Sequence, residues 1–332
     1  MLIGINGSFL RRPGTGIGQV SAEFLRALRD WEGEERFILY LDEEIDWELT
    51  PAVEAKVIAP LWRRDDLLRL LLWERVQLPR AVRADGCEAF FSLYQSTTVL
   101  PAAVRHLMLV HDLIPEIFPA YLDNWRKKLI WRLSKKAIRQ ASVLSSVSRS
   151  TAADLEKILK IAAAKIHLTP PSVEEIFSPS AAAADKARVA EKYSLPPGGY
   201  IYFGGGLDLR KNAPALLEAY RRLRAARASF PPLVVSGKLQ PALAPLWTDI
   251  ESLVREMGLS ESVRILGFVP REDLPALYGN ALFFVYPSLY EGFGLPVLEA
   301  LAVGAPVACS NTPAVAEVAG EAALFFDPNK VE

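Results

Sequence analysis

The chain has 332 residues, a formal net charge of −1, and a composition that is 51% hydrophobic and 23% charged. This length is enough for about two domains with cores of their own, and the composition is typical of a globular enzyme or binding protein. Because 38 basic residues are balanced by 39 acidic ones, we do not expect nucleic acid as a partner.

The cysteines, the N-terminal sequence, the apolar runs and the histidines further restrict the class of protein to which the chain can belong. The two cysteines, Cys87 and Cys309, exclude a disulfide scaffold and suit a reducing cytoplasm. The N-terminal sequence MLIGINGSFL lacks the basic start and long apolar core of a signal peptide, and no run approaches the roughly 18 apolar residues of a membrane span. The three histidines are too scattered in the sequence to suggest a metal cluster, and we expect no cofactor.

The first predicted element is a buried strand at 2–5, followed by a glycine-rich loop at 11–18 and a helix. Glycines let the backbone approach a ligand closely, and the N–H groups of a helix start can face a phosphate. Gly16 is therefore our candidate for a backbone contact. A plain turn is the alternative, and a dinucleotide fingerprint fits poorly because Gln19 stands where a third glycine is needed.

A histidine and an aspartate follow a later strand directly. An apolar helix with a basic fringe at 63–83 precedes strands at 89–92 and 107–110, and His111 and Asp112 come next. Parallel sheets bind ligands at the carboxyl ends of their strands, so His111 is a candidate site residue. A structural histidine is the alternative, and Asp112 could orient His111 or activate an acceptor hydroxyl.

Residues 121–140 are predicted to form a basic amphipathic helix. Its apolar stripe consists of Leu122, Trp125, Leu129, Leu133 and Ala137. One interpretation is docking on an anionic membrane, and the other is a solvated helix that covers the core. A strand at 142–147, a helix capped by Ser148 and a strand at 166–169 complete this half.

The alternating pattern weakens between 172 and 199, where prolines and glycines bracket one short helix. We therefore predict a first domain at 1–173, a linker at 174–198 and a second domain at 199–332. Alternating strands and helices in both halves predict an α/β protein with two Rossmann-like domains that face a cleft.

The second half opens with a strand at 200–203 and the segment GGGLDLRKN. Glycines at a strand end, with Arg210 and Lys211 at the following helix start, suggest a pyrophosphate site that includes Gly206. Ordinary surface charge at a helix start is the alternative. Strands at 233–236 and 264–268 follow, and Gly267 lies near the end of the second.

Residues 281–310 predict a strand, a loop, a short helix and a strand. Two carboxylates lie there: Glu291 in the loop and Glu299 in what we expect to be the first turn of the helix. Carboxylates at this place can accept hydrogen bonds from the hydroxyls of a sugar or ribose. The alternative is a capping role for Glu299 and a solvated loop position for Glu291.

The stretch EGFGLPVLEALAVGAPV resembles the glutamate motif of retaining GT-B glycosyltransferases, family 4 in particular. The segments HDLIPEIFP and GGGLDLRKN resemble the same family, and the likeness covers nearly the whole chain. It implies that His111 and Glu291 contact the donor sugar and that Arg210 and Lys211 bind the diphosphate. It implies further donor contacts at Gly16, Gly206, Gly267, Gly292, Phe293, Gly294, Leu295 and Glu299, where Glu299 meets the ribose.

The resemblance implies a retaining, metal-independent hexosyltransferase of polysaccharide biosynthesis. Its expected donor is GDP-mannose, and its expected acceptor is a sugar hydroxyl of a glycan or lipid-linked saccharide. A cytoplasmic protein with peripheral contact at the inner membrane face is expected. Family members usually carry an additional arginine where Gly205 or Gly206 stands, and they usually continue with C-terminal helices that this chain is expected to lack.

Three other functions remain open. A glycosidase also uses two carboxylates, but it needs no basic, glycine-rich diphosphate site. A catalytically inactive module could bind a nucleotide sugar and dock on a membrane through 121–140. A dinucleotide-dependent dehydrogenase would bind NAD instead of a nucleoside diphosphate.

Overall fold

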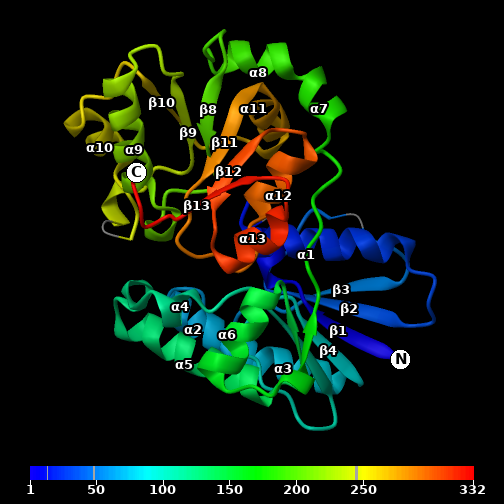
Figure 1. Ribbon diagram of the computed structural model, residues 1–332. Helices are drawn as coiled ribbons and strands as arrows, with labels where there is room; N and C mark the ends of the chain where they lie inside the picture. Colours follow the sequence, from blue (N-terminus) through cyan, green and yellow to red (C-terminus); the bar gives the residue numbers. More distant parts are fainter. Residues whose placement is uncertain (13, 48, 244–245) are drawn as a thin grey trace. The chain divides into compact units, whose positions relative to one another are not determined.

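The computed structural model describes residues 1–12, 14–47, 49–243 and 246–332, so residue 13 of the predicted glycine-rich loop lies outside the described residues. The chain forms two compact units, Met1–Ser172 and Val173–Glu332, and each is described by itself. Each unit is built on one sheet whose strands pair in parallel (Figure 1). The predicted pair of Rossmann-like α/β domains is confirmed, whereas the cleft stays a prediction.

The sheet of the first domain has seven strands in the order β3-β2-β1-β4-β5-β6-β7. The strands are β1 (Leu2–Asn6), β2 (Arg36–Leu41), β3 (Val53–Val57), β4 (Ala89–Ser92), β5 (Arg105–Val110), β6 (Val143–Ser146) and β7 (Ile166–Leu168). Strand β3 was not predicted. It lies at the sheet edge and is mostly exposed, so it lacks the apolar run that marks the other strands.

Helices cover both faces of this sheet. They are α1 (Gly16–Ala27), α2 (Asp66–Leu72), α3 (Leu78–Ala84), α4 (Ile114–Ile117), α5 (Trp125–Gln140) and α6 (Arg149–Leu159). Helix α1 packs on a cluster that contains Ile5 and Leu39, and α3 packs on a cluster that contains Tyr40 and Phe90. A π-helical turn, Trp73–Gln77, joins α2 to α3, so the helix predicted at 63–83 is interrupted.

Helix α5 differs from its prediction in its first residue and at one position of its apolar stripe. It begins at Trp125 because Asn124 caps it by accepting from the Lys127 N–H at 3.0 Å. Its buried face contains Trp131, Ala137 and Ile138, whereas Trp125 is exposed. The predicted apolar stripe was therefore wrong for Trp125. The predicted Ser148 cap of α6 is confirmed: its hydroxyl accepts from the Thr151 N–H at 3.0 Å.

The second domain has a six-stranded sheet in the order β10-β9-β8-β11-β12-β13. Its strands are β8 (Tyr200–Phe203), β9 (Leu233–Ser236), β10 (Val263–Gly267), β11 (Ala281–Tyr286), β12 (Val307–Ser310) and β13 (Leu324–Phe326). Its helices are α7 (Pro179–Ala184), α8 (Lys186–Lys192), α9 (Ala213–Ala226), α10 (Ile250–Glu256), α11 (Leu274–Asn280), α12 (Leu295–Ala302) and α13 (Pro313–Ala319).

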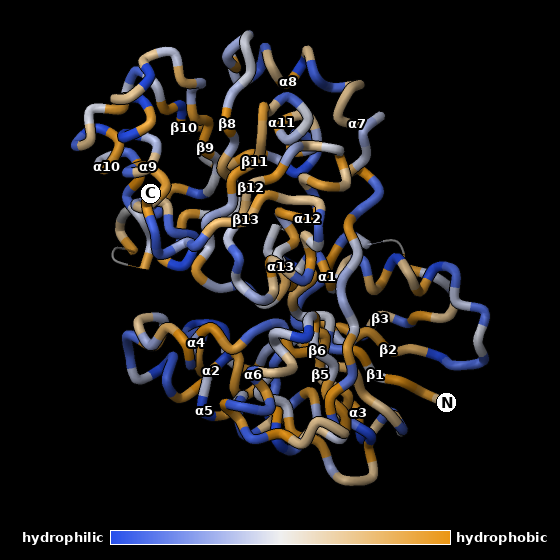
Figure 2. Tube along the Cα trace, in the orientation of Figure 1, coloured by the Kyte–Doolittle hydropathy of each residue, from blue (hydrophilic) through white to orange (hydrophobic). Residues whose placement is uncertain are grey.

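Two apolar clusters lie on opposite faces of the second sheet. One contains side chains of α9 and α10, and the other contains side chains of α7, α8, α11, α12 and α13 (Figure 1). Strand β11 lies near the middle of the sheet and is coloured mostly as apolar in Figure 2. A strand with helices on both faces needs apolar residues on both sides, which explains its continuous apolar run.

The segment predicted as a linker, 174–198, is part of the second domain. It forms two helices, α7 and α8, instead of one, and both pack against α11. Phe177, Ala182 and Val189 are buried in the cluster that includes Tyr278 of α11. The sequence did not predict that this segment packs in the core, because it is rich in alanine and alanine contributes little to an apolar pattern.

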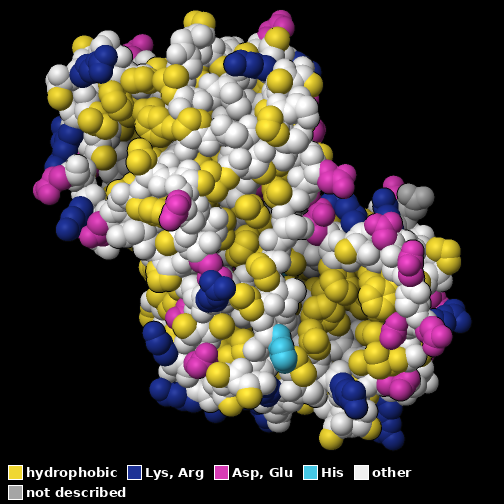
Figure 3. Space-filling view, turned by 45° about the vertical axis from the view of Figure 1, so that its right-hand side comes forward, with side chains coloured by type: hydrophobic (Ala, Val, Ile, Leu, Met, Phe, Trp, Pro, Cys, Tyr) yellow, Lys and Arg dark blue, Asp and Glu magenta, His cyan; other side chains and the backbone are white. Residues whose placement is uncertain are grey.

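The charges of the surface are mixed. On the face shown in Figure 3, basic and acidic side chains are interspersed among apolar ones, as the net charge of −1 implies. Among the residues that the structure describes, no helix has both the length and the apolar character to cross a membrane.

Candidate active site

The loops that follow β8 and β11 carry the central charged residues of the second domain. These strands are neighbours in the sheet, so their carboxyl ends lie side by side. Arg210 and Lys211 lie in a 3₁₀ turn after β8, and Glu291 lies in the loop after β11. The backbone joins the two loops, because the Leu289 N–H donates to the Arg210 carbonyl at 2.7 Å.

Glu291 is buried and accepts hydrogen bonds at both carboxylate oxygens. Its Oε1 accepts from Lys211 Nζ at 2.7 Å, from the Tyr286 hydroxyl at 2.7 Å and from the Ser288 hydroxyl at 2.6 Å. Its Oε2 pairs with the guanidinium of Arg210. The glutamate is therefore buried and paired, and the alternative of a solvated loop residue is wrong.

The pKa of Glu291 is set by two opposing effects. Burial raises it, but the charges of Arg210 and Lys211 outweigh burial and hold the pKa at about 2. Burial and the neighbouring Arg210 lower the pKa of Lys211. At neutral pH the carboxylate is thus ionised and is a weak base and nucleophile.

Glu299 lies on α12, but one turn later than predicted. The helix begins at Leu295, so Glu299 is its fifth residue and does not cap the helix start. The carboxylate is buried and bonded by Arg271 NH1 at 3.0 Å and by the Tyr278 hydroxyl at 3.0 Å. Burial raises the pKa of Glu299, and Arg271 opposes that rise.

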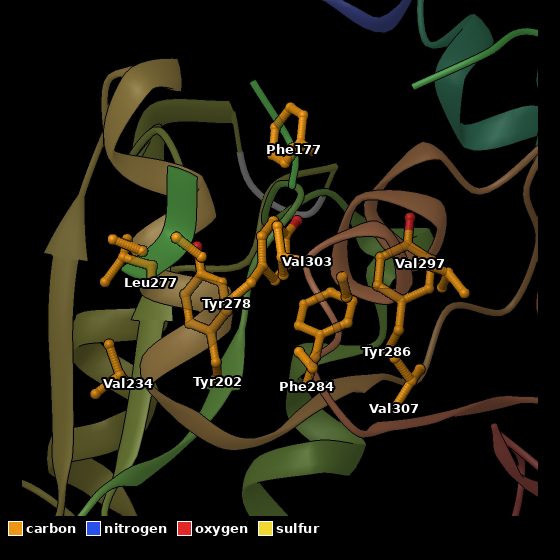
Figure 4. Close-up of a cluster of buried hydrophobic side chains, with 14 of the residues drawn as sticks. Phe177, Tyr202, Val234, Leu277, Tyr278, Phe284, Tyr286, Val297, Val303 and Val307 are labelled. Carbon is orange, nitrogen blue, oxygen red and sulfur yellow. The ribbon is translucent and has the colours of Figure 1, made fainter. Parts of the chain in front are cut away.

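Buried aromatic rings, among them Tyr278, Phe284 and Tyr286, pack in the core of the second domain (Figure 4). Phe284 lies between Tyr278, at a centroid distance of 5.0 Å, and Tyr286, at 5.7 Å. The hydroxyl of Tyr278 donates to Glu299 and that of Tyr286 donates to Glu291. Because the rings are packed in the core, they fix the positions of the two carboxylates.

Two glycines are required where the site loops meet. Gly205 has φ +92°, and a Cβ there would lie 2.9 Å from Pro296 Cγ, so the loop after β8 packs directly on the start of α12. Gly294 has φ +117° and precedes the first residue of α12. Both positions favour glycine, because L side chains rarely adopt these angles.

All but one of the other predicted donor-binding residues of the second domain lie in the loops after β8 and β11 or at the start of α12, and Gly267 is the exception. Gly206 follows Gly205 at φ +110°, and Gly267 ends β10. The remaining ones, Gly292, Phe293 and Leu295, lie between Glu291 and the first turn of α12. The structure brings Arg210 and Lys211 into direct contact with Glu291, and Gly206, Gly292, Phe293 and Leu295 lie within four positions of one of these residues in the sequence.

The predicted residues of the first domain are Gly16 and His111. Gly16 is the exposed first residue of α1, which Thr15 caps by accepting from the Gly18 N–H at 3.1 Å. His111 is buried, and its Nε2 lies 2.8 Å from the Leu93 carbonyl. Because a carbonyl only accepts, Nε2 carries the proton and Nδ1 is left as an acceptor.

Burial lowers the pKa of His111 to about 4, so its imidazole is neutral at pH 7. Asp112 Oδ1 accepts from the Ile114 N–H at 3.0 Å, at the start of α4, and its proposed role beside His111 stays a prediction. Local turn geometry of this kind is typical of aspartate.

Sequence reasoning missed four residues that hold the glutamates: Tyr286, Ser288, Tyr278 and Arg271. Tyr286 and Ser288 lie within five residues of Glu291. The directions of their side chains depend on the pleat of β11 and on the path of the loop after it, which the sequence does not show. Arg271 lies in the turn after Gly267. A basic residue close to a strand end could have suggested a binding role from the sequence, but it is a weak indication. In the described part of the chain, no three or more His, Cys, Asp or Glu side chains gather in a way that could hold a metal ion.

Family models match both halves of the chain. Residues 14–177 match the model described as glycosyltransferase family 4, and residues 189–332 match the model described as glycosyl transferases group 1. The two matches lie almost entirely within one domain each.

Similar curated proteins include the O-antigen chain mannosyltransferase B of Escherichia coli, which is 35% identical over 69% of this chain and 58% of its own length. A serotype-specific mannosyltransferase of Escherichia coli is 34% identical, over 69% of this chain and 28% of its own length. The chain thus spans less than two thirds of these relatives. The O-antigen chain mannosyltransferase RfbU of Salmonella typhimurium is 25% identical over 98% of this chain and 86% of its own length.

Solved structures share the fold. A sucrose-phosphate synthase from Thermosynechococcus elongatus matches with a TM-score of 0.73 and 19% identity, over 100% of this chain and 87% of its own. WaaG, a glycosyltransferase involved in lipopolysaccharide biosynthesis, matches with a TM-score of 0.73 and 15% identity, over 98% and 86%.

The pairing of Glu291 predicts a pH-dependent contribution to stability. Its folded pKa of about 2 lies below the ordinary value of 4.5, so the stabilisation is complete above pH 4.5 and is lost as the pH falls toward 2. We expect Glu291→Gln to melt below the wild type at pH 7, with a difference that shrinks below pH 4.5. Melting temperatures measured from pH 7 to pH 3 check this, and a difference independent of pH would contradict it.

Proposed function

Since this chain belongs to glycosyltransferase family 4, with the GT-B fold, we propose that it transfers a hexose from a nucleoside-diphosphate sugar to a hydroxyl of a glycan. The observation that carries the proposal is the buried contact of Arg210 and Lys211 with Glu291 at the carboxyl ends of β8 and β11. Strand ends of this kind are where open α/β sheets bind ligands.

Arg210 and Lys211 are the groups that stabilise the leaving diphosphate in this proposal. Negative charge grows on the diphosphate as its bond to the sugar breaks, and fixed cations lower the energy of that state. Both cations are held by Glu291, and Arg210 is also held by Asp208 at 3.1 Å. Their positions are thus set before a donor binds, and we propose that they act without a metal ion.

Transfer proceeds on one face of the sugar in this proposal. The bond from the anomeric carbon to the phosphate oxygen breaks, a bond to the acceptor oxygen forms on the same face, and the acceptor proton passes to the departing phosphate. The low pKa of Glu291 supports this route, because a carboxylate neutralised by two cations is a poor covalent nucleophile. Glu291 then positions the donor sugar, and the product retains the donor configuration.

Two further residues have proposed binding roles. The unprotonated Nδ1 of His111 can accept a hydrogen bond from a hydroxyl of the donor sugar. Glu299 can accept from the ribose, since a carboxylate oxygen takes more than one donor and Arg271 and Tyr278 occupy one site on each. The backbone N–H groups of 292–294 are proposed to hold sugar hydroxyls.

Mannose is the proposed sugar and GDP-mannose the proposed donor, because the three curated relatives named above are mannosyltransferases. The acceptor is proposed to be a sugar of a growing or lipid-linked glycan, as the O-antigen activity in two of those names suggests. A module that binds the nucleotide sugar without turnover is the alternative, and the experiments below distinguish the two.

We also propose peripheral contact with an anionic membrane through one surface of the first domain. Arg126 at the start of α5 pairs with Asp65 at 2.6 Å, which holds the segment 61–68 beside the helix. Four large apolar side chains are exposed there: Trp125 (64%), Leu61 (67%), Trp62 (45%) and Leu68 (45%). Exposed basic residues of these segments include Arg63, Arg64, Lys128, Arg132 and Lys136. Apolar side chains bordered by cations are typical of such contacts.

Donor binding is tested by thermal shift with GDP, GDP-mannose, UDP, UDP-glucose, ADP and NAD, each with and without EDTA. A ligand at a hundred times its dissociation constant stabilises by about 2.7 kcal/mol, which raises Tm by several degrees. We expect the largest shift with GDP or GDP-mannose, unchanged by EDTA. Lys211→Ala and Glu299→Ala should abolish it, whereas Lys186→Ala, an exposed lysine of α8, should not. A shift with NAD alone would contradict the proposal.

The stereochemistry of the product tests the mechanism. With α-linked GDP-mannose as donor and an oligomannose acceptor, we expect an α-linked product by NMR, because attack and departure take place on one face. A β-linked product would rule out retention. Binding of GDP-mannose with no product from any acceptor would favour the inactive binding module.

Vesicle sedimentation tests the membrane contact. The single variants Trp62→Ser and Trp125→Ser should each weaken binding to vesicles containing anionic lipid, since each variant loses an exposed ring that could insert into the interface. Trp31→Ser is the matched control, because Trp31 is 43% exposed but lies outside this surface. Equal loss in all three variants, or none in any, would contradict the proposal.

A further inference from the structure

Glu74 is a buried carboxylate that the proposed function leaves without a role. It lies in the π-helical turn between α2 and α3 and is almost completely shielded from solvent. Its Oε2 accepts from the Thr97 N–H and the Thr97 hydroxyl, each at 2.6 Å, and its Oε1 accepts from the Tyr94 hydroxyl. Burial raises the pKa of Glu74, and the bonds from Thr97 and Tyr94 oppose that rise.

The groups bonded to this carboxylate are a phenol, a hydroxyl and a backbone N–H, all of them neutral. A buried carboxyl group with neutral partners is costly, and an apolar side chain of similar size at the same place is often more stable. A π-helical turn is likewise a local irregularity that is frequent at functional sites. Two unfavourable features at one residue suggest a purpose other than packing.

The partners of Glu74 lie in one short loop, and that loop also holds His111. Tyr94 and Thr97 bond to Glu74, whereas Leu93 and Gln95 bond to the histidine. The Leu93 carbonyl accepts from His111 Nε2 at 2.8 Å, and Gln95 Oε1 accepts from the His111 N–H at 3.2 Å. The loop 93–97 thus lies between the carboxylate and the imidazole.

The loop is also fixed from a second side. Arg75, the neighbour of Glu74 in the π-helical turn, donates from NH1 to the Thr97 carbonyl at 3.0 Å. The Tyr94 hydroxyl accepts from Asn6 Nδ2 at 3.1 Å, which links the loop to the end of β1. The loop therefore cannot shift without breaking bonds to the π-helical turn.

We propose that Glu74 is a positioning residue that, through loop 93–97, fixes the ring orientation and tautomer of His111. The carboxylate holds the loop, the Leu93 carbonyl keeps the proton of His111 on Nε2, and Nδ1 stays unprotonated toward the donor. Without the carboxylate the carbonyl moves, and either ring nitrogen can carry the proton. The effect of this change on transfer rests on the proposed function, whereas its effect on the histidine does not.

The test is ¹⁵N NMR of histidine-labelled protein, in which the chain's three histidines give few signals and His111→Gln assigns one set. In the wild type we expect one protonated and one unprotonated ring nitrogen for His111 at pH 7. In Glu74→Ala these two signals should move toward each other, as a mixture of tautomers requires. Glu74→Gln, which can still accept from Thr97, should lie closer to the wild type.

Asp85→Asn is the matched control, because Asp85 also accepts from a buried tyrosine, Tyr40, at 2.8 Å but does not belong to this network. Its His111 signals should be those of the wild type. Tyr94→Phe serves as the second variant, since it removes one bond to Glu74 with little loss of volume. If Glu74→Ala does not fold, Tyr94→Phe decides. Wild-type His111 signals in the folded variants, or the same change in Asp85→Asn, would overturn the proposal.

Kinetics provide a second readout. We expect Glu74→Ala to lower kcat by about 100-fold, as misplacement by 1 Å can, with little change in the KM for the donor. An increase in KM with unchanged kcat would overturn the positioning role. If the wild type transfers no sugar, the proposed function fails, and the NMR signals still decide the role of Glu74.

Discussion

The burial of Glu291 between two cations is the interaction on which the candidate site of the second domain depends. A carboxylate removed from water is costly unless it is paired and hydrogen-bonded, and here Arg210 and Lys211 pair it while Tyr286 and Ser288 donate to it. The cations come from the loop after β8 and the glutamate from the loop after β11. The charge can therefore be buried only when both loops are in place, which fixes their relative geometry.

The buried rings of Tyr278, Phe284 and Tyr286 link the two glutamates to the core of the second domain. Tyr278 and Tyr286 pack on Phe284 and are fully buried, yet each directs its hydroxyl to one of the two glutamates. A buried tyrosine needs a partner for its hydroxyl, and a buried carboxylate needs donors. The tyrosine hydroxyls donate to Glu291 and Glu299 and so satisfy both groups at once. The packing of the core and the geometry of the site therefore depend on each other. Glu74 and Tyr94 form a similar pair in the first domain.

The fold could be predicted where burial on both faces leaves a continuous apolar run between glycines and prolines. Strands β4, β8 and β9 were predicted to the residue for this reason. Strand β3 was missed, because an edge strand with exposed charges has no such run. Trp125 was wrongly included in the apolar stripe of α5, because the helix contains both Trp125 and Trp131 and only packing decides which of them is buried.

The sequence by itself determined that the chain has two α/β halves. It also determined that glycines lie in the loops at strand ends and that Arg210, Lys211, Glu291 and Glu299 lie in those loops or on the helix that follows. Each of these features depends on local pattern and spacing. Only the tertiary structure decided what these residues contact. Lys211 and Glu291 are 80 positions apart and meet because β8 and β11 are neighbours in the sheet. Local sequence does not specify strand order, which is set by how the helices pack on both faces. The link from Glu74 through loop 93–97 to His111 has the same origin.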